Sequence, residues 1–315
     1  MKKILITGAY GFIGRHLSSS LAKEGNSIAG IGRGDWRHEK PGDWGISEWQ
    51  TGDIDSDNLD VLLGVWGVPD IVYHCAGSSS VAASLSNPQK ALRDTVVSTS
   101  ALIEWVARTN TEASIVVISS AAVYGSDYDR PISQNDSESP ISIYGTHKLM
   151  TEVLCRNYAK QFDLKVIMPR IFSVYGVGLR KQLFWDLCER ANGKGEIVLG
   201  GSGNEMRDWI DVRDLVKILA ELPFYATADA PVVNVASGHP NSVKEVAGLI
   251  CQSLQLLNGQ KVSVAFDGNV RPGNPISLIA KSTELDKISV KGNILIAEGI
   301  ADYVGWYIQE TRSKF

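Results

Sequence analysis

A tyrosine and a lysine on one helical repeat are the strongest indication of chemistry in this chain. They are Tyr144 and Lys148, and two serines, Ser119 and Ser120, precede them. Residues four positions apart share one face of a helix, so the phenol and the ammonium can point into the same site. A positive charge close to a phenol stabilises the phenolate and lowers its pKa from about 10. The pair therefore predicts an acid/base that exchanges a proton with a carbinol oxygen.

A glycine-rich turn near the start of the chain predicts a ligand for this acid/base. Gly8, Gly11 and Gly14 follow a short apolar run and open an amphipathic stretch that begins with Phe12 and Ile13. Without side chains, backbone amides and the positive end of the helix can approach a pyrophosphate. The alternative is a tight strand-to-helix turn with no ligand. The order of strand, turn and helix favours a bound dinucleotide whose nicotinamide would lie beside the acid/base.

The choice of cofactor depends on the end of the second expected strand. NAD-binding proteins usually carry an acidic residue there for the ribose 2′-hydroxyl, and Gly32 occupies that position. Arg33 could pair with a 2′-phosphate, so NADP(H) is favoured, with NAD as the alternative. In that alternative Arg33 faces solvent and Asp35 serves the ribose. Asp53 and Ile54 are placed to meet the adenine, although Asp53 could equally be a turn residue.

Composition restricts the class of protein. The chain has 315 residues, 44% of them hydrophobic, and a formal net charge of −4 at pH 7. This charge argues against nucleic acid and anionic membranes as partners, and no apolar run approaches the roughly 20 residues that span a bilayer. The four cysteines form no Cys-x-x-Cys pair, and the five histidines form no ligand-spaced cluster. We therefore expect a cytoplasmic protein with reduced thiols and no metal.

The elements that would position these residues follow an alternating pattern. Short β-branched runs alternate with longer amphipathic stretches, which predicts βαβ units and a parallel sheet. The fold class is α/β, a Rossmann-type doubly wound sheet with a smaller C-terminal substrate-binding region. The expected strands are 3–7, 27–31, 71–74, 114–119, 165–168 and 232–235, and the expected helices of this part are 12–23, 88–108 and 142–161.

The second part of the chain has a looser pattern. Glycine-rich loops are expected around 176–178 and 193–203, with helices near 179–191 and 212–222. We expect residues 1–170 to form the dinucleotide-binding domain and residues 171–315 to form mainly the substrate-binding region. A strand near 231–236 is expected to return to the main sheet, so that the second region grows out of the first. The segment 35–49, rich in tryptophan, is interpreted as a long ordered loop.

Taken together, these motifs resemble one family. The chain is similar to the extended short-chain dehydrogenases/reductases of the NAD-dependent epimerase/dehydratase type, which modify sugar nucleotides. The resemblance implies that Ser120 hydrogen-bonds the reacting sugar oxygen and that Tyr144 is the general acid/base. It also implies that Lys148 binds the nicotinamide ribose and lowers the tyrosine pKa, and that Ala76 lines the cofactor site. The matching segments cover essentially the whole chain: 7–14, 53–54, 74–77, 118–125, 144–148, 169–170, 207–211 and 271–273.

Two departures from the family pattern affect the expected function. Related sugar-nucleotide 4,6-dehydratases carry acidic residues directly after the catalytic serine or threonine. Ala121 and Ala122 stand there and cannot move a proton, so dehydration is disfavoured. Thr95 and Ser173 occupy positions where the family often has asparagine. Ser173 is expected to contact substrate, but the nicotinamide and diphosphate contacts need not be the usual ones.

Positive residues in the second half point to a nucleotide diphosphate. Arg207 and Arg271 match the pair of arginines with which the family holds that group, because guanidinium forks suit phosphate oxygens. The alternative is a structural salt bridge, such as Arg207 with Asp208 or Asp211. Arg180 and Lys181 could add positive charge, and Arg180 is counted among the expected substrate residues.

The function favoured by these residues is reduction. We expect an NADP(H)-dependent reductase that delivers hydride to C4 of a nucleoside-diphosphate 4-keto-6-deoxysugar, in polysaccharide biosynthesis. The alternative is a nucleotide-sugar 4-epimerase, which oxidises C4, returns the hydride to the other face and retains its NAD. A third hypothesis is a non-catalytic NADP-binding sensor, although such a protein would be expected to lose the tyrosine or the lysine. The resemblance also implies a homodimer formed through helices 88–108 and 142–161.

Overall fold

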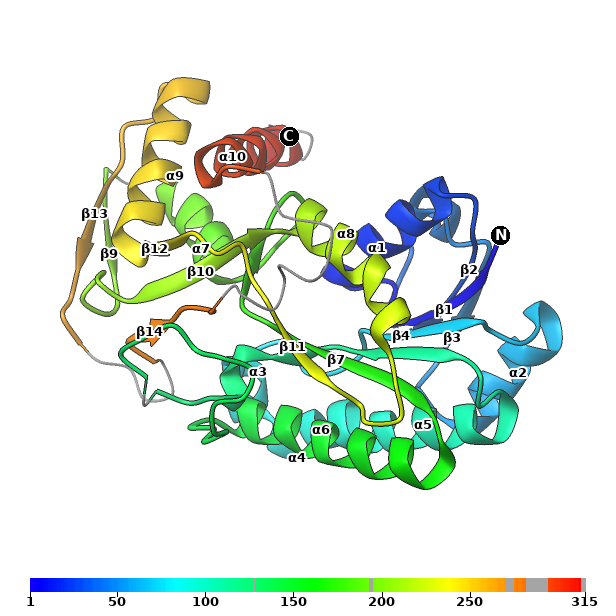
Figure 1. The fold of residues 1–315 in the computed structure, drawn as a ribbon. Helices are drawn as coiled ribbons and strands as arrows, with labels where there is room; N and C mark the ends of the chain where they lie inside the picture. Colours follow the sequence, from blue (N-terminus) through cyan, green and yellow to red (C-terminus); the bar gives the residue numbers. More distant parts are fainter. Residues whose placement is uncertain (127, 193–194, 270–274, 282–293, 313–315) are drawn as a thin grey trace.

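A central parallel sheet with helices on both faces forms the larger part of the molecule. The computed structural model describes residues 1–126, 128–192, 195–269, 275–281 and 294–312. In Figure 1 a smaller group of strands and helices lies beyond one end of the main sheet. Sheet and flanking helices together confirm the expected Rossmann-type α/β fold.

The main sheet has the strand order β11-β7-β5-β4-β1-β2-β3, and its neighbouring strands are parallel. The chain order reverses between β1 and β4, and ligands bind at the carboxyl ends of the strands beside such a reversal. The short β6 continues the line of β5 and also pairs with β7. The strands are β1 Lys3–Thr7, β2 Ser27–Gly32, β3 Glu48–Thr51, β4 Ile71–His74, β5 Ser114–Val117, β6 Ser119–Ser120, β7 Lys165–Ile171 and β11 Val232–Val235.

Two layers of helices cover the sheet. Figure 1 shows α1 (Phe12–Lys23) and α8 (Val212–Glu221) on one face, and α5 (Ser98–Thr109) and α6 (Ile143–Phe162) side by side on the other. Helix α2 (Ser56–Trp66) packs on the same face as α5 and α6. Their buried residues recur at helical spacing, as Leu17 and Leu21 do in α1. None of the helices in the described ranges is long and apolar enough to cross a membrane.

The smaller region has its own apolar core. It contains β8 (Ser173–Tyr175), β10 (Met206–Asp211), β12 (Pro240–Ser242) and β14 (Ser277–Leu278) in one sheet, and β9 (Glu196–Leu199) with β13 (Ser263–Phe266) in another. The helices α7 (Gln182–Ala191), α9 (Val243–Asn258) and α10 (Ile296–Arg312) pack around them. The chain reaches β11, which pairs with β7 of the main sheet, between β10 and β12.

Several expected elements differ from the structure. The glycine-rich loop expected around 193–203 contains β9. The helix expected at 88–108 is divided into α4 (Pro88–Leu92), a π-helical turn (Arg93–Val97) and α5. The expected loop 35–49 contains the 3₁₀ turn Pro41–Trp44 and runs into β3, because glycine at position 30 of β2 leaves space for the ring of Trp49. The helix expected from residue 179 begins only at Gln182, whose φ of 64° turns the chain there.

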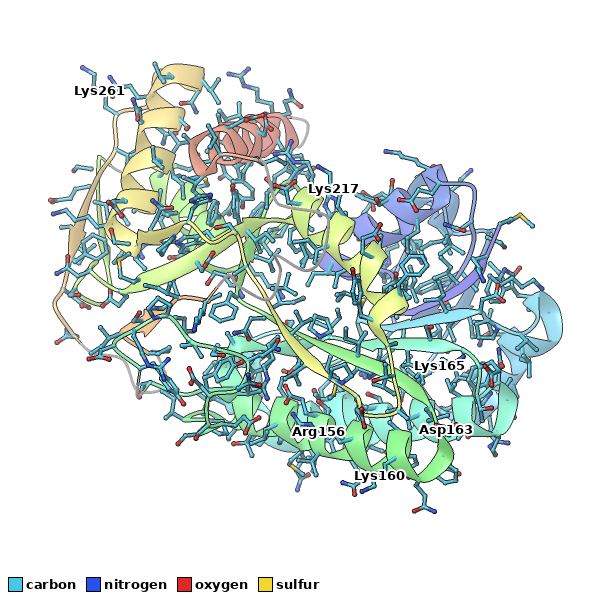
Figure 2. The ribbon with its side chains drawn as sticks, viewed as in Figure 1. Arg156, Lys160, Asp163, Lys165, Lys217 and Lys261 are labelled. Carbon is cyan, nitrogen blue, oxygen red and sulfur yellow. The ribbon has the colours of Figure 1, made fainter. Side chains whose placement is uncertain are left out.

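A buried ion pair joins the sheet to α6. Arg170 on β7 and Glu152 on α6 are both fully buried, and two hydrogen bonds of 2.9 and 2.6 Å connect them. Ser119 also donates to Glu152, at 2.6 Å. Arg156, labelled in Figure 2, adds a partly exposed contact of 3.1 Å to the same carboxylate. The end of β6 is therefore held against the helix by charge-assisted hydrogen bonds.

Replacing the buried arginine should strongly destabilise the fold. Arg170→Met leaves the Glu152 carboxylate buried without its main partner, which typically costs about 3–5 kcal/mol of unfolding free energy. Urea unfolding measures this loss. Arg156→Met is the matched control, because the Arg156 guanidinium is partly exposed and its loss leaves Arg170 as the main partner of Glu152, so we expect a cost of about 1 kcal/mol. If Arg170→Met cost no more than Arg156→Met, the buried pair would not hold the fold as described.

Candidate active site

A cleft of about 1620 Å³ runs along the carboxyl ends of the parallel strands and continues into the smaller region. One wall comes from the turns that follow β1, β2, β4 and β6, and the other comes from the segments around α7 and β10. Typical small-molecule pockets have about 300–1,000 Å³. This cleft is therefore large enough for a dinucleotide together with a second nucleotide.

The glycine turn fits a pyrophosphate. A Cβ on Gly8, whose φ is 68°, would lie 2.7 Å from the amide nitrogen of Ala76, and a Cβ on Gly14 would lie 2.4 Å from the Gly8 oxygen. Helix α1 starts after Gly11, which caps it without a side chain. The first amides of the helix are therefore free of a side-chain cap, and Phe12 lines the cleft beside them. Ile13 and Ala76 line the same part of the cleft.

The structure brings Ser120, Tyr144 and Lys148 together in this cleft. The Ser142 hydroxyl accepts a hydrogen bond from the Gly145 amide at 3.1 Å and starts α6, which places Tyr144 in its first turn. The side chains of Ser120 and Tyr144 are hydrogen-bonded to each other. One turn further along α6, Lys148 is 6% exposed, and its Nζ donates to the backbone oxygen of Ile118 at 2.8 Å.

The electrostatics of the pair differ from the expectation. Burial lowers the pKa of Lys148 to about 8, an effect that Cys75 and Glu152 oppose only in part. Burial raises the pKa of Tyr144 above its ordinary value, and the hydrogen bond with Ser120 lowers it only in part. The net shift of the tyrosine pKa is therefore upward, opposite to the lowering expected from the lysine, and its main cause is desolvation. At neutral pH the structure holds a neutral phenol beside a buried ammonium.

Arg33 is paired with acidic residues at the cofactor end of the cleft. Its Nε lies 2.8 Å from Asp53 Oδ1, and its Nη2 pairs with Asp94 in the π-helical turn. Lys90 also pairs with Asp94. The other residue considered for the ribose, Asp35, pairs with Arg37 and does not line the cleft. The guanidinium expected to meet a 2′-phosphate is therefore already held between two carboxylates.

Arg207 lies in the cleft and forms no ion pair with the residues that the structure describes. Its Nη1 donates to the Met206 oxygen at 2.7 Å, and burial lowers its pKa. Asp208, the partner considered for a structural salt bridge, instead accepts hydrogen bonds of 2.8 Å from the amide and hydroxyl of Ser237. Within the described part of the chain Arg207 forms no ion pair, so its guanidinium is available to an anion. Arg271 lies outside the described residues.

The two neighbouring cations before α7 point to different places. Arg180 pairs with Glu310 at 2.8 Å and stacks over Trp306, both on α10, and it does not line the cleft. Lys181 does line the cleft, and its Nζ approaches the Ser79 oxygen at 3.4 Å across it. The structure therefore places Lys181, and not Arg180, in the cleft lining. Residue type and spacing do not distinguish adjacent cations in an irregular segment.

The structure also places Ser173 and Thr95, the two positions where the family often has asparagine. Ser173 lines the cleft and begins β8, which pairs with β10, the strand that carries Arg207. Thr95 is buried in the π-helical turn, and its Oγ1 accepts a hydrogen bond of 2.9 Å from the Ser78 amide. Thr95 therefore fixes the turn after β4. The serines 78–80 in that turn line the cleft, and no sequence motif identified them.

Comparison with known proteins identifies a single family. The model of the NAD dependent epimerase/dehydratase family matches residues 4–236. A UDP-glucose 4-epimerase of Lactobacillus helveticus is 29% identical over 301 residues, which cover 90% of this chain and 89% of that protein. The structure of MoeE5 in complex with UDP-glucuronic acid and NAD is 29% identical, with a TM-score of 0.83, and covers 98% of this chain and 99% of the other.

A second solved structure belongs to the same group. It is the UDP-glucuronic acid 4-epimerase from Bacillus cereus in complex with UDP-glucuronic acid and NAD. The two chains are 25% identical with a TM-score of 0.83, and the match covers 98% of this chain and 99% of that one.

Replacing the buried Lys148 by an uncharged residue should stabilise the protein, by an amount that depends on pH. The folded-state pKa of Lys148, about 8, lies below the ordinary 10.5, so the ammonium disfavours folding below pH 8, by roughly 3 kcal/mol. This penalty fades as the pH rises from 8 to 10.5. Lys148→Met should raise the unfolding free energy at pH 7 by about 1–2 kcal/mol, since the lost hydrogen bond to Ile118 costs about 1 kcal/mol.

Urea unfolding at pH 7 and pH 10 measures both values. Lys160→Met is the matched control, because Lys160 is exposed on the same helix (Figure 2); its effect should stay within about 0.5 kcal/mol. Equal destabilisation by Lys148→Met at both pH values would contradict the buried-charge description.

Proposed function

Because the chain belongs to the NAD-dependent epimerase/dehydratase family, we propose that it is a 4-epimerase of a nucleoside-diphosphate sugar that retains NAD. Family membership confirms the expected resemblance and the expected class of enzyme. The sequence favoured a 4-ketoreductase, with the epimerase as the alternative. The alternative now has the better support, because the relatives and neighbouring structures described above include 4-epimerases, and MoeE5 is a complex with NAD.

The observation that carries the proposal is the arrangement of Ser120, Tyr144 and Lys148 in one cleft, with two alanines directly after the serine. Ala121 and Ala122 also line the cleft, directly after the serine. Alanine cannot transfer a proton, so these two positions do not supply the second acid/base that elimination of water requires. The site supports a reaction in which one acid/base gives and takes a proton at a single oxygen.

When bound, a nicotinamide would supply the acceptor and donor of hydride for the sugar C4. In our proposal the Tyr144 phenol exchanges its proton with the C4 oxygen in both directions. Ser120, hydrogen-bonded to Tyr144, would orient that oxygen. The Lys148 ammonium would favour the phenolate when the proton leaves the phenol, because it is the closest fixed positive charge along α6 and is shielded from water.

Residues of the smaller region would hold the rest of the substrate. We propose that residues 1–170 bind mainly the dinucleotide and residues 171–315 mainly the nucleotide sugar. The unpaired guanidinium of Arg207 suits a diphosphate, and Arg271 is proposed as its second partner. Lys181 would add a positive charge on the opposite side of the cleft, near the turn that contains Ser79. Binding energy at the diphosphate would then position the sugar at the reacting groups.

We also propose a homodimer formed through α5 and α6. Apolar side chains are exposed on α6, namely Met150, Val153 and Phe162. Light scattering of the native protein would test this proposal, and a monomer at micromolar concentration would contradict it.

A direct assay distinguishes the epimerase from the reductase. The purified protein is incubated with UDP-glucose, UDP-N-acetylglucosamine or UDP-glucuronic acid labelled with deuterium at C4, and the sugars are followed by NMR. We expect conversion of at least one of them to its C4 epimer with the label retained and no net change in reduced nicotinamide. Stoichiometric oxidation of NADPH by a 4-keto sugar nucleotide, without epimerisation, would restore the reductase. Tight cofactor binding with no turnover would favour the sensor.

Removing the phenolic hydroxyl should abolish most of the turnover. Tyr144→Phe eliminates the acid/base, and such groups contribute about 10²–10⁴-fold to the rate. We expect kcat to fall by at least about a hundredfold, with the bound nucleotide content unchanged. Tyr158→Phe, on the same helix but absent from the cleft lining, is the matched control and should remain within twofold of the native rate. Native kcat in Tyr144→Phe would exclude the proposed role.

A further inference from the structure

A buried histidine lies between the two turns that form the cofactor side of the cleft. His74 ends β4 beside Thr7, the last residue of β1, and is 2% exposed. Its Nδ1 lies 2.7 Å from Thr7 Oγ1, and its Nε2 lies 2.9 Å from Thr99 Oγ1 on α5. His74 does not belong to the cleft lining. Both of its ring nitrogens are therefore used within the protein, one towards the glycine turn and one towards the helix layer.

The neighbouring hydroxyl groups determine which ring nitrogen carries the proton. Thr99 donates its single hydroxyl proton to the backbone oxygen of Thr95, so it can only accept from His74. Nε2 is therefore the protonated nitrogen. In a neutral imidazole Nδ1 is then an acceptor, and the Thr7 hydroxyl donates to it. The Thr7 oxygen in turn accepts a hydrogen bond of 3.3 Å from the Ala76 amide.

The surroundings of His74 keep its ring neutral. Burial lowers the pKa of His74 to about 3, and the Lys148 ammonium acts in the same direction. At neutral pH the ring therefore donates one hydrogen bond and accepts one. The direction of the whole series, from the Ala76 amide to the Thr95 oxygen, follows from this single tautomer.

The link through Thr7 supports the glycine turn. Thr7 directly precedes Gly8, and a Cβ on Gly8 would lie 2.7 Å from the amide nitrogen of Ala76. The Thr7 hydroxyl thus joins the two segments at the point where they touch. Gly8 and Ala76 both line the cleft. Loss of this link should loosen the part of the cleft that fits a pyrophosphate.

The link through Thr99 supports the turn beside the buried ammonium. Thr99 holds the backbone oxygen of Thr95, and the Oγ1 of Thr95 accepts a hydrogen bond of 2.9 Å from the Ser78 amide. Gly77, whose φ is 141°, lies between these groups and Lys148. A Cβ on Gly77 would lie 3.4 Å from Thr95 Oγ1 and 3.7 Å from Lys148 Nζ. The turn that Thr95 holds therefore covers the ammonium on this side.

We propose that His74 is a positioning residue with two separable roles: through Thr7 it holds the glycine turn for the dinucleotide, and through Thr99 it holds Gly77 over Lys148. A neutral histidine suits both roles, because one ring nitrogen accepts while the other donates. The inference rests on the proposed function only in placing a dinucleotide at the glycine turn. It makes no use of the sugar reaction, so the epimerase assignment can fail without affecting the test.

Two substitutions separate the roles, because each keeps one of the two polar positions. In His74→Asn the Oδ1 atom stands at the position of Nδ1 and can accept from Thr7. In His74→Gln the Nε2 atom stands at the position of the ring Nε2 and can donate to Thr99. His74→Phe keeps the ring shape and neither link.

Two quantities are measured on the full-length protein freed of bound nucleotide. The first is the dissociation constant of NAD, by calorimetry. The second is the pKa of Lys148, from the chemical shift of lysine labelled with ¹³C at Cε.

The two substitutions should affect different quantities. His74→Gln should weaken NAD binding by about tenfold, the effect of one lost hydrogen bond, and should leave the Lys148 pKa unchanged. His74→Asn should leave NAD binding within about twofold. It should raise the Lys148 pKa from about 8 towards the ordinary 10.5, by about one pH unit, because water reaches the ammonium once Gly77 is released. His74→Phe should show both effects.

Tyr73→Phe is the matched control. Tyr73 precedes His74 on β4 and is also buried, but its hydroxyl donates to the Leu219 oxygen, at 3.1 Å, in the layer on the other face of the sheet. The substitution removes a buried hydrogen bond from the same strand without touching the two turns. It should leave NAD binding within about twofold and the Lys148 pKa unchanged.

A measurement on the native protein tests the proton order directly. The ¹⁵N signals of His74, assigned by their absence in His74→Gln, should show a protonated Nε2 and an unprotonated Nδ1 from pH 8 down to pH 5. A proton on Nδ1, or a ring that titrates in this range, would overturn the proposal. Equal effects of His74→Asn and His74→Gln on both quantities, or effects no larger than those of Tyr73→Phe, would overturn it as well.

Discussion

The site depends on the burial of one ammonium group. Lys148 is almost completely enclosed, and its hydrogen bond is to the backbone oxygen of Ile118 rather than to a carboxylate. Lys148 forms no ion pair with the described residues, and desolvation of such a charge is unfavourable, which is why its pKa falls to about 8. The surrounding fold must therefore hold the lysine in place, and the stability of the sheet and of α6 supplies that constraint.

The arrangement of strands explains how this is achieved. β5 lies beside β4, next to the reversal of strand order between β1 and β4, and the Ile118 oxygen and Ser120 lie at the carboxyl edge of the sheet where the cleft opens. Behind them, Glu152 accepts hydrogen bonds from Ser119 and Arg170, which hold α6 against the sheet. Lys148 and Glu152 are one helical turn apart, so these hydrogen bonds also determine where the ammonium lies. Catalytic geometry and fold stability share the same interactions.

Much of the fold and of the candidate site could be predicted from the sequence. The strands 3–7, 71–74 and 232–235 have the expected boundaries, because buried parallel strands are short, continuous apolar runs between turns. The residues Ser120, Tyr144 and Lys148 lie together because each belongs to a local motif whose spacing determines its position. A sequence pattern predicts the local structure where residues close together in the sequence determine it.

The remaining features depend on contacts between distant segments. The pairing of Arg33 with Asp94 requires a π-helical turn 61 residues away in sequence, and no periodicity indicates such a turn. The direction of Arg180 toward α10 rather than the cleft depends on Glu310. The raised pKa of Tyr144 depends on how deeply the first turn of α6 is covered. Charge alone suggested the opposite direction, because desolvation is a property of the packed structure.

The most direct test is the titration of Lys148 itself. The protein is labelled with lysine that carries ¹³C at Cε, the signal of Lys148 is assigned by its absence in Lys148→Met, and its chemical shift is followed from pH 6 to pH 12. The buried ammonium described above should titrate with a pKa of about 8. A pKa near the ordinary 10.5 would mean that the group is solvated or paired, and the central claim would be wrong.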